Sequence, residues 1–424
     1  MRNRPRVVVV GGGVLGTCIA GACAARSARV TLLDAAVPGS GTSSTSFAWA
    51  NAQKKRPESY FRLNAEGLAE YHRLARAGVG SGWFHAVGNV EVAVDAASAE
   101  ALEANVADLA ARGYAAENVS ARRAADLEPL IDPDRIAAAA YFPDEGWVDA
   151  EEMVSDALAD VRAGTGVIRT HHAVVGFEPA GAGTKVLLAD GEELLADYVV
   201  CATGTATEAL LAGSGIAVPM ISETARKPRA SGGEGREGSP DERYTAVGGL
   251  AFTAPLRSPL RRIVHTPDMG LRPSAYGRAV LGGDGAGSRV PRNDPAVFEN
   301  GPRLLERARR LFPAMAEVTL DAVRVGVRPM PADGLTVAGF TESVPGLYVV
   351  VTHSGITLAQ YLARLVAGEV LGSKEAAALA DFRPGRFAAA RLEDVAPADK
   401  GSAEKGSAEK APVEEGLVGD RKRG

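Results

Sequence analysis

The chain opens with a hydrophobic run that ends in glycines, and this pattern predicts a buried strand. Val7 to Val10 are four consecutive valines followed by Gly11-Gly12-Gly13, which suits a central parallel strand covered on both faces. The small-residue stretch from Val14 to Arg26 is long enough for a helix, and Val30 to Leu33 supplies a second strand that ends at Asp34. This order indicates a strand-helix-strand unit of the parallel α/β type.

The middle of the chain mixes two periodicities. Val90, Val92 and Val94 alternate with polar neighbours, which predicts a half-exposed strand. Two other stretches carry apolar residues at helical spacing: Tyr60, Leu63, Leu68, Tyr71 and Leu74, and then Leu102, Val106 and Leu109. We therefore expect antiparallel strands and helices to be interleaved in this region.

Later segments return to strand patterns before a last helix. A strand-like pattern begins at Val167, Asp190-Gly191 predicts a hairpin turn between apolar runs, and Val199 to Ala202 predicts a strand. The stretch 244–281 is again strand-like, Tyr348 to Val351 predicts another buried strand, and 357–371 predicts a helix. Two polar, Gly- or charge-rich stretches, 223–243 and the tail 393–424 with its repeated KGSAE, are expected to be a mobile loop and a disordered tail.

Composition excludes several classes of protein. The 424 residues are 46% hydrophobic with a formal net charge of −5, which gives no electrostatic reason to expect nucleic acid or an anionic membrane as partner. Three cysteines without metal-ligand spacing indicate neither a disulfide framework nor a metal site. No segment approaches the ~20 apolar residues that span a bilayer, and the N-terminal apolar run is interrupted by glycines, unlike a signal peptide. These observations predict a cytoplasmic protein.

The first chemical signal is Gly11-Gly12-Gly13-Val14-Leu15-Gly16, a G-x-G-x-x-G between the predicted strand and helix. In such a motif Gly11 permits the tight turn, Gly13 lets a pyrophosphate approach the backbone, and Gly16 lets the helix pack closely on the sheet. The helix N-terminus attracts the phosphates. Asp34 at the end of the second strand can bind the ribose hydroxyls. The motif predicts a dinucleotide, and by itself leaves NAD and FAD open.

Four features together resemble the D-amino-acid oxidase superfamily, which includes glycine oxidases, sarcosine oxidases and D-amino-acid dehydrogenases. They are the N-terminal glycines, the Ser/Thr-rich loop Gly41–Asn51, the late Val-Val-Cys-Ala-Thr-Gly ending at Gly204, and the C-terminal glycine-helix. The resemblance runs from about Val7 to about Phe387. It implies a two-domain α/β (α+β) chain with a Rossmann-type, glutathione-reductase-like FAD-binding domain and an antiparallel-sheet substrate domain. The implied FAD-binding segments are 1–85, 146–220 and 326–392, and the implied substrate segments are 86–145 and 221–325.

The resemblance also implies a set of site residues. Arg328, in Val327-Arg328-Pro329 before Asp333-Gly334, matches an arginine that binds the substrate carboxylate, and a planar guanidinium suits that task. His353 precedes the helix under the flavin, with an orienting or packing role, and is the other candidate beside the chemistry. The residues implied to bind the cofactor are Gly11, Gly13, Val14, Leu15, Gly16, Asp34, Ala35, Ser43, Ser44, Ser46, Val174, Thr203, Gly204, Arg328, Gly355, Ile356, Thr357 and Leu358.

The chain departs from its relatives at informative places. Gly326 and Val327 stand near where sarcosine oxidases carry a flavin-bonding cysteine, so non-covalent FAD is expected. The strand ending near His265 lacks the tyrosine of glycine oxidases, and 279–282 lacks the lysine of sarcosine oxidases. The amine substrate, and O₂ or another electron acceptor, therefore stay open.

The expected reaction is oxidation of a C–N bond in an amine or amino acid by hydride transfer to the flavin, followed by hydrolysis of the imine. The alternatives are a flavin hydroxylase, an NAD-dependent dehydrogenase, or a non-catalytic flavin-binding subunit of a hetero-oligomeric oxidase.

Overall fold

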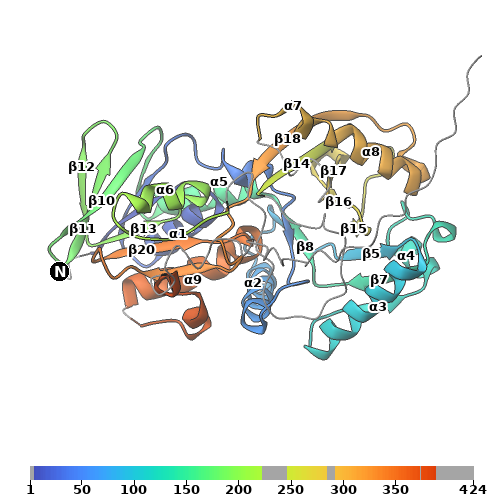
Figure 1. The fold of residues 1–424 in the computed structure, drawn as a ribbon, viewed down its shortest axis with the longest axis horizontal. Helices are drawn as coiled ribbons and strands as arrows, with labels where there is room; N and C mark the ends of the chain where they lie inside the picture. Colours follow the sequence, from blue (N-terminus) through green and yellow to red (C-terminus); the bar gives the residue numbers. More distant parts are fainter. Residues whose placement is uncertain (1–3, 222–245, 284–291, 373, 388–424) are drawn as a thin grey trace, which may run out of the picture. The chain divides into compact units, whose positions relative to one another are not determined.

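The N-terminal strand is the centre of a six-stranded sheet in the computed structural model, which describes residues 4–221, 246–283, 292–372 and 374–387 (Figure 1). The strand order is β19-β20-β13-β1-β2-β9, parallel except for the edge strand β19. The strands are β1 (Arg6–Val10), β2 (Arg29–Leu33), β9 (Val167–Arg169), β13 (Tyr198–Cys201), β19 (Val337–Phe340) and β20 (Leu347–Val351). The predicted strand-helix-strand unit is confirmed.

Both faces of this sheet are covered, which explains the uninterrupted valines of β1. Val7 and Val9 pack with helices α1 (Val14–Ala25), α5 (Ala150–Ala163) and α9 (Gly355–Gly372) in one apolar core. Val8 and Val10 pack in another core, together with the antiparallel meander of β10 (Val174–Ala180), β11 (Gly183–Leu188) and β12 (Glu193–Ala196). Alternate side chains of a strand point to opposite faces, so a strand between two cores is apolar throughout.

A second, eight-stranded sheet has the order β18-β14-β17-β16-β15-β5-β7-β6. Its strands are β5 (Asn89–Ala93), β6 (Glu117–Val119), β7 (Ala138–Phe142), β14 (Val247–Thr253), β15 (Ile263–His265), β16 (Gly270–Pro273), β17 (Ala279–Gly282) and β18 (Leu320–Val327). All its pairs are antiparallel except β5 with β15, which is parallel. The expectation of a wholly antiparallel sheet is corrected at this one pair, where two distant chain segments meet.

The helices α4 (Ala121–Leu127) and α8 (Asn300–Leu311) contribute to the apolar core on one face of this sheet. The long helices α2 (Glu58–Arg76) and α3 (Ala96–Ala111) match the helical spacing in the sequence. Val94 lies outside β5 and is 38% exposed, so the predicted strand ends one residue before it. The predicted mobile loop 223–243 and tail 393–424 lie outside the described residues.

A small three-stranded sheet, β3-β8-β4, contributes three short strands beside the site. They are β3 (Trp49–Ala50), β4 (Phe84–His85) and β8 (Gly146–Val148), and Trp49 pairs directly with Trp147.

Candidate functional site

The glycine-rich turn between β1 and α1 has two glycines that no other residue can replace without moving the backbone. Gly11 has φ +102°, and a Cβ there would lie 2.5 Å from the carbonyl oxygen of Ala202. A Cβ on Gly16 would lie 1.8 Å from the carbonyl oxygen of Gly11. At Gly13 the nearest atom to an added Cβ is Ser43 Oγ, at 3.3 Å. Gly11 and Gly16 therefore serve the turn and the packing, whereas Gly13 keeps the approach to the helix clear.

The first turn of α1 is suited to bind an anion. It contains no acidic residue, and Gly13 provides no side-chain cap. Ser43 Oγ accepts a hydrogen bond of 3.1 Å from the Val14 N–H, and so ties the loop after β2 to this helix. The N-terminal N–H groups of a helix and its dipole favour phosphate, so the turn fits the diphosphate of a dinucleotide.

Asp34 follows β2 and is fixed by the backbone on either side of it. Its two carboxylate oxygens accept hydrogen bonds of 2.7 Å from the N–H groups of Gly12 and Ala36, while Ala35 between them is exposed. Each carboxylate oxygen has a second acceptor position, which suits the hydroxyls of a ribose. Val174 begins β10 just after His172, whose N–H donates to the Asp34 carbonyl at 2.8 Å.

The Ser/Thr-rich loop forms a 3-10 helix, Thr42–Thr45, and most of its hydroxyls stabilise the loop itself. Ser44 Oγ donates to the Gly41 carbonyl at 3.0 Å, and Ser46 Oγ accepts from the Ala48 N–H at 3.0 Å. Thr42 Oγ1 donates to the carbonyl of Val327 at 2.6 Å, which joins the loop to the end of β18. Of the three predicted serines, only Ser43 contacts α1.

The loop crosses the second sheet over a strip of glycines. A Cβ on Gly326 would lie 2.1 Å from Thr45 Oγ1, and a Cβ on Gly282 would lie 2.9 Å from the Phe47 ring. A Cβ on Gly270 would meet both Phe47 and His265, at 3.0 and 2.8 Å. Larger side chains here would push the loop away, so this face of the sheet is shaped to receive it.

Arg328 lies at one end of this strip. Its N–H donates to the Ala246 carbonyl at 2.7 Å, directly after β18. A Cβ on Gly248, also on the strip, would lie 2.9 Å from Arg328 Nη2. The partly buried guanidinium thus lies against the same face of the sheet that receives the loop.

The start of α9 lies beside the start of α1. A Cβ on Gly355 would be 4.0 Å from the side chains of Val14 and Leu15. Thr357 Oγ1 accepts from the Asn51 N–H at 3.2 Å, and the Tyr71 hydroxyl donates to the Ile356 carbonyl. Two helix N-termini therefore converge on the loop, and Leu358 is buried in the core behind them.

His353 immediately precedes this helix and is partly buried. The neighbouring Ser354 is held by a 2.8 Å hydrogen bond between its hydroxyl and that of Tyr60. The segment Thr203–Gly204 follows β13 on the neighbouring side, with Gly204 at φ +57° and its Cβ position 3.9 Å from Pro329. The structure therefore brings together the segments around residues 11–16, 42–46, 203–204, 328 and 353–358.

An aromatic and cationic cluster near the other end of the strip did not emerge from the sequence. Arg272 on β16 is 7% exposed, donates to the carbonyls of Phe47 and Pro273, and lies 4.8 Å from the centre of the Trp147 ring. His265 packs on Trp49, with ring centroids 4.1 Å apart. Burial lowers the pKa of Arg272 to about 10. The only local signal is an arginine within the otherwise apolar Gly270–Pro273.

Glu145 connects this cluster to the core. It is fully buried and accepts four hydrogen bonds of 2.7 to 3.0 Å, from Trp49 Nε1, Gln53 Nε2, Asn89 Nδ2 and the Tyr114 hydroxyl. Burial raises its pKa to about 7 against those hydrogen bonds. Because the Asn89 amide donates to Glu145, its oxygen accepts from His265 Nδ1 at 3.0 Å. This fixes His265 in the tautomer whose Nε2 is an acceptor.

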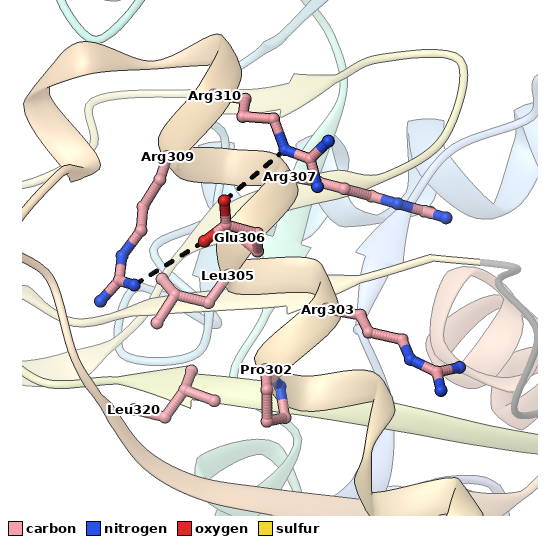
Figure 2. A pocket seen from close by; sticks show the side chains of 8 residues that line it. All are labelled: Pro302, Arg303, Leu305, Glu306, Arg307, Arg309, Arg310 and Leu320. Atoms are coloured by element: carbon pink, nitrogen blue, oxygen red, sulfur yellow. Dashed lines mark ion pairs between the residues drawn. The ribbon is translucent and has the colours of Figure 1, made fainter.

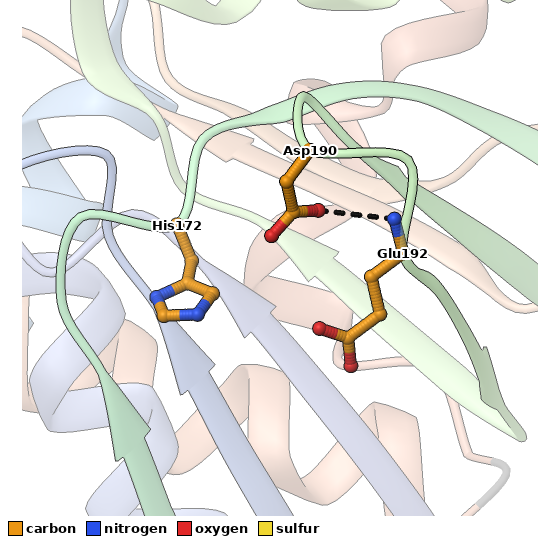
Figure 3. Close-up of side chains that lie close together, drawn as sticks. All are labelled: His172, Asp190 and Glu192. Atoms are coloured by element: carbon orange, nitrogen blue, oxygen red, sulfur yellow. Dashed lines mark hydrogen bonds between the residues drawn. The ribbon is translucent and has the colours of Figure 1, made fainter.

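Two other features lie apart from these segments. A pocket of about 560 Å³ along α8 is lined by Pro302, Arg303, Leu305, Glu306, Arg307, Arg309, Arg310 and Leu320, with Glu306 paired to two of the arginines (Figure 2). The trio His172, Asp190 and Glu192 has metal-ligand atoms close together (Figure 3). Arg169 already holds the Glu192 carboxylate with two hydrogen bonds of 2.8 and 2.5 Å, so an ion pair accounts for the trio.

Comparison with known proteins agrees with this geometry. Glycine oxidase of Geobacillus kaustophilus is 26% identical over 90% of this chain and 97% of its own, and a glycine oxidase structure from that organism has a TM-score of 0.76 at 23% identity, covering 90% and 99%. An opine oxidase subunit of Agrobacterium tumefaciens is 23% identical over 90% and 97%. Iminodiacetate oxidase of Chelativorans sp. BNC1 has a TM-score of 0.73 at 20% identity, covering 89% and 99%.

These structural likenesses establish the two-sheet fold. In the described part of the chain, no helix is long and apolar enough to cross a membrane. The model for the family described as "DAO: FAD dependent oxidoreductase" matches residues 6–369. The protein is therefore an FAD-dependent enzyme, and the chain belongs to the DAO family of FAD-dependent oxidoreductases.

Proposed function

We propose that this protein oxidises the C–N bond of an amine that carries a carboxylate. The observation that carries this proposal is the position of Arg328, whose guanidinium lies against the glycine strip facing the cofactor loop. A partly buried guanidinium on that face suits bidentate binding of a carboxylate. FAD, when bound, supplies the acceptor for the hydride that leaves the carbon beside the nitrogen.

The residues of the chain then bind, orient and exclude water. Gly13, the N–H groups of α1 and Ser43 hold the diphosphate, and Asp34 holds the ribose. The start of α9, with Gly355, Ile356 and Thr357, stabilises negative charge on the flavin ring. Arg328 fixes the substrate carboxylate, while His353 orients the approach to the helix. The relatives named for glycine and iminodiacetate support a substrate that is both an amine and a carboxylate.

Anaerobic mixing of the yellow holoenzyme with single compounds tests this function. Glycine, N-methylglycine, D-alanine and iminodiacetate would be compared with methylamine and ethylamine, which lack the carboxylate. We expect bleaching of the flavin by at least one of the carboxylated amines and slower or no bleaching by the simple amines. Equal bleaching by both groups would contradict the carboxylate assignment. Oxygen consumption in air would then identify O₂, or another molecule, as the electron acceptor.

A second candidate is a flavin-binding subunit that needs a partner chain, favoured by the likeness to the Agrobacterium opine oxidase subunit over 97% of that protein. It predicts a flavin that dithionite reduces but that no carboxylated amine reduces in the isolated chain.

A further inference from the structure

The cluster around Arg272 lies on the face of the sheet that bears the glycine strip. Along β16, Gly270 and Arg272 point to this face, whereas Leu271 between them points into the opposite apolar core. Arg272 pairs with Val280, and Val280 with Phe252, two strands from Arg272 and four residues along β14 from Gly248. Strand dimensions place Arg272 roughly 16 Å from Gly248, Cα to Cα. Arg272 and Arg328 therefore border one site from two sides.

Arg272 is a buried cation without a partner anion. No carboxylate in the described part of the chain forms an ion pair with it, and its guanidinium contacts only two carbonyls and the rings of Phe47 and Trp147. The charge of Asp149 attracts it, but the carboxylate of Asp149 already accepts the N–H groups of Glu151 and Glu152 at the start of α5. Burying an uncompensated charge is costly, and an anion would relieve that cost.

The ring beside Arg272 also carries an unused donor. Trp147 is 6% exposed, and its Nε1 is buried without a hydrogen-bond partner. His85 stacks on the same ring with centroids 3.9 Å apart, so the indole is held firmly in place. Buried donors are nearly always satisfied in native proteins. An orphan indole N–H next to an unpaired guanidinium has the composition of an anion site.

We propose that Arg272 and Trp147 form a second carboxylate-binding subsite, and that the preferred substrate is a secondary amine bearing two carboxylates. This inference rests on the proposed function, in which Arg328 binds the first carboxylate. The amine nitrogen then lies between the two anionic ends, on the side where His265 presents Nε2 as an acceptor for an N–H. Phe47 and Trp49 line the apolar part of the space between them.

Kinetics with two matched amines test the subsite in the holoenzyme. Iminodiacetate has two carboxylates, and N-ethylglycine replaces one of them by a methyl group. We expect wild type to prefer iminodiacetate by at least 30-fold in kcat/KM, equivalent to about 2 kcal/mol. Arg272→Gln should remove this preference and leave N-ethylglycine oxidation unchanged. Arg272→Lys should restore part of it, because lysine keeps the charge and loses the fork.

Two further variants separate the subsite from a structural role. Trp147→Phe keeps the ring and removes the N–H, and it should lower the preference for iminodiacetate. Arg262→Gln is the matched control, because Arg262 also donates to a carbonyl, that of Val87, and lies over an aromatic ring, Tyr141, on the same sheet. It should leave the preference intact. Equal losses for both amines in Arg272→Gln, or an unchanged preference in Trp147→Phe, would overturn the proposal.

Binding of diglycolate distinguishes failure of the subsite from failure of the proposed function. Diglycolate replaces the iminodiacetate N–H by an ether oxygen, and ethoxyacetate is its partner with one carboxylate. If neither amine reduces the flavin, the proposed oxidation is wrong, and the subsite still predicts that diglycolate raises the Tm of the holoenzyme more than ethoxyacetate does. That difference should vanish in Arg272→Gln. Equal effects of the two ethers on wild type would refute the subsite.

Discussion

A Cβ atom on Gly16 would lie 1.8 Å from the carbonyl oxygen of Gly11, so the first turn of α1 touches the end of β1 directly. Alanine at position 16 would separate helix and strand, and the apolar core between them would open. We expect Gly16→Ala to lower the Tm of the apoprotein and to prevent FAD binding. The measurement is thermal unfolding with and without added FAD.

Gly13→Ala is the informative companion. The added methyl group would meet only Ser43 Oγ, at 3.3 Å, so the apoprotein should unfold near the wild-type temperature. The methyl group would occupy the approach of the diphosphate, and FAD affinity should fall by at least tenfold, about 1.4 kcal/mol. An FAD titration followed by fluorescence measures this. Wild-type affinity would show that the phosphates bind elsewhere.

FAD should be released by acid precipitation. Gly326 and Val327 stand beside the loop where a bonding cysteine would be needed. Cys18, Cys23 and Cys201 are buried in the cores on the two faces of the first sheet, and burial raises their thiol pKa values to about 12, 12 and 11. Yellow colour in the supernatant of the precipitated protein would agree. Flavin retained in the washed pellet would contradict the prediction.

Arg328→Ala should weaken catalysis for carboxylated amines selectively. Charge-assisted contacts in a dry site are worth about 2–5 kcal/mol, so kcat/KM should fall by roughly 30-fold to several thousand-fold. Arg328→Lys should recover part of the loss. Arg324→Ala is the control, because Arg324 lies on the same strand β18 with its side chain half-exposed over Phe252. If Arg328→Ala slows an amino acid and its decarboxylated amine equally, the residue serves the flavin or the fold.

His265 should make stability depend on pH. Burial and the charge of Lys54 lower the pKa of this imidazole from 6.5 to about 3. The unfolded chain therefore takes up a proton below pH 6.5 that the folded chain takes up only near pH 3, and folding is weakened on acidification through this window. Between pH 6.5 and 5, the free energy of unfolding of wild type should fall relative to His265→Asn by on the order of 2 kcal/mol. Urea unfolding at both pH values measures the difference. A constant difference would mean that the ring titrates normally.

Glu145→Gln should destabilise the protein despite its similar size. All four groups around the carboxylate are donors, and the new amide would direct its own NH₂ at two of them. Leaving buried donors unpaired costs about 1–3 kcal/mol each. The same variant should loosen His265 through Asn89, which shows as a change in flavin absorbance of the holoenzyme. An unchanged Tm would contradict the hydrogen-bond network.

The sequence predicted the elements whose pattern is local. Val7 to Val10, the glycine turn and the helix after it form one continuous signal, because each residue's burial follows from its own position in the strand or turn. Arg272 and Glu145 carried no such signal. Their roles depend on Phe47, Trp147 and Asn89, which approach only when the loop folds over the strip and β5 pairs with β15. Val94 was misassigned for a related reason, since alternation continues past the point where the partner strand ends.

The pairing of β5 with β15 also dictates when the protein can fold during its synthesis. Residues 89–91 leave the ribosome long before residues 263–265 that they pair with, and β13 waits in the same way for β20 at residues 347–349. Until those strands emerge, the nascent chain exposes two unpaired strand edges and the apolar face of α1 that later contacts α9. Edges of this kind promote association with other chains. The growing polypeptide therefore depends on chaperones or on rapid completion, and FAD can stabilise it only at the end, when Gly355 has joined Gly13.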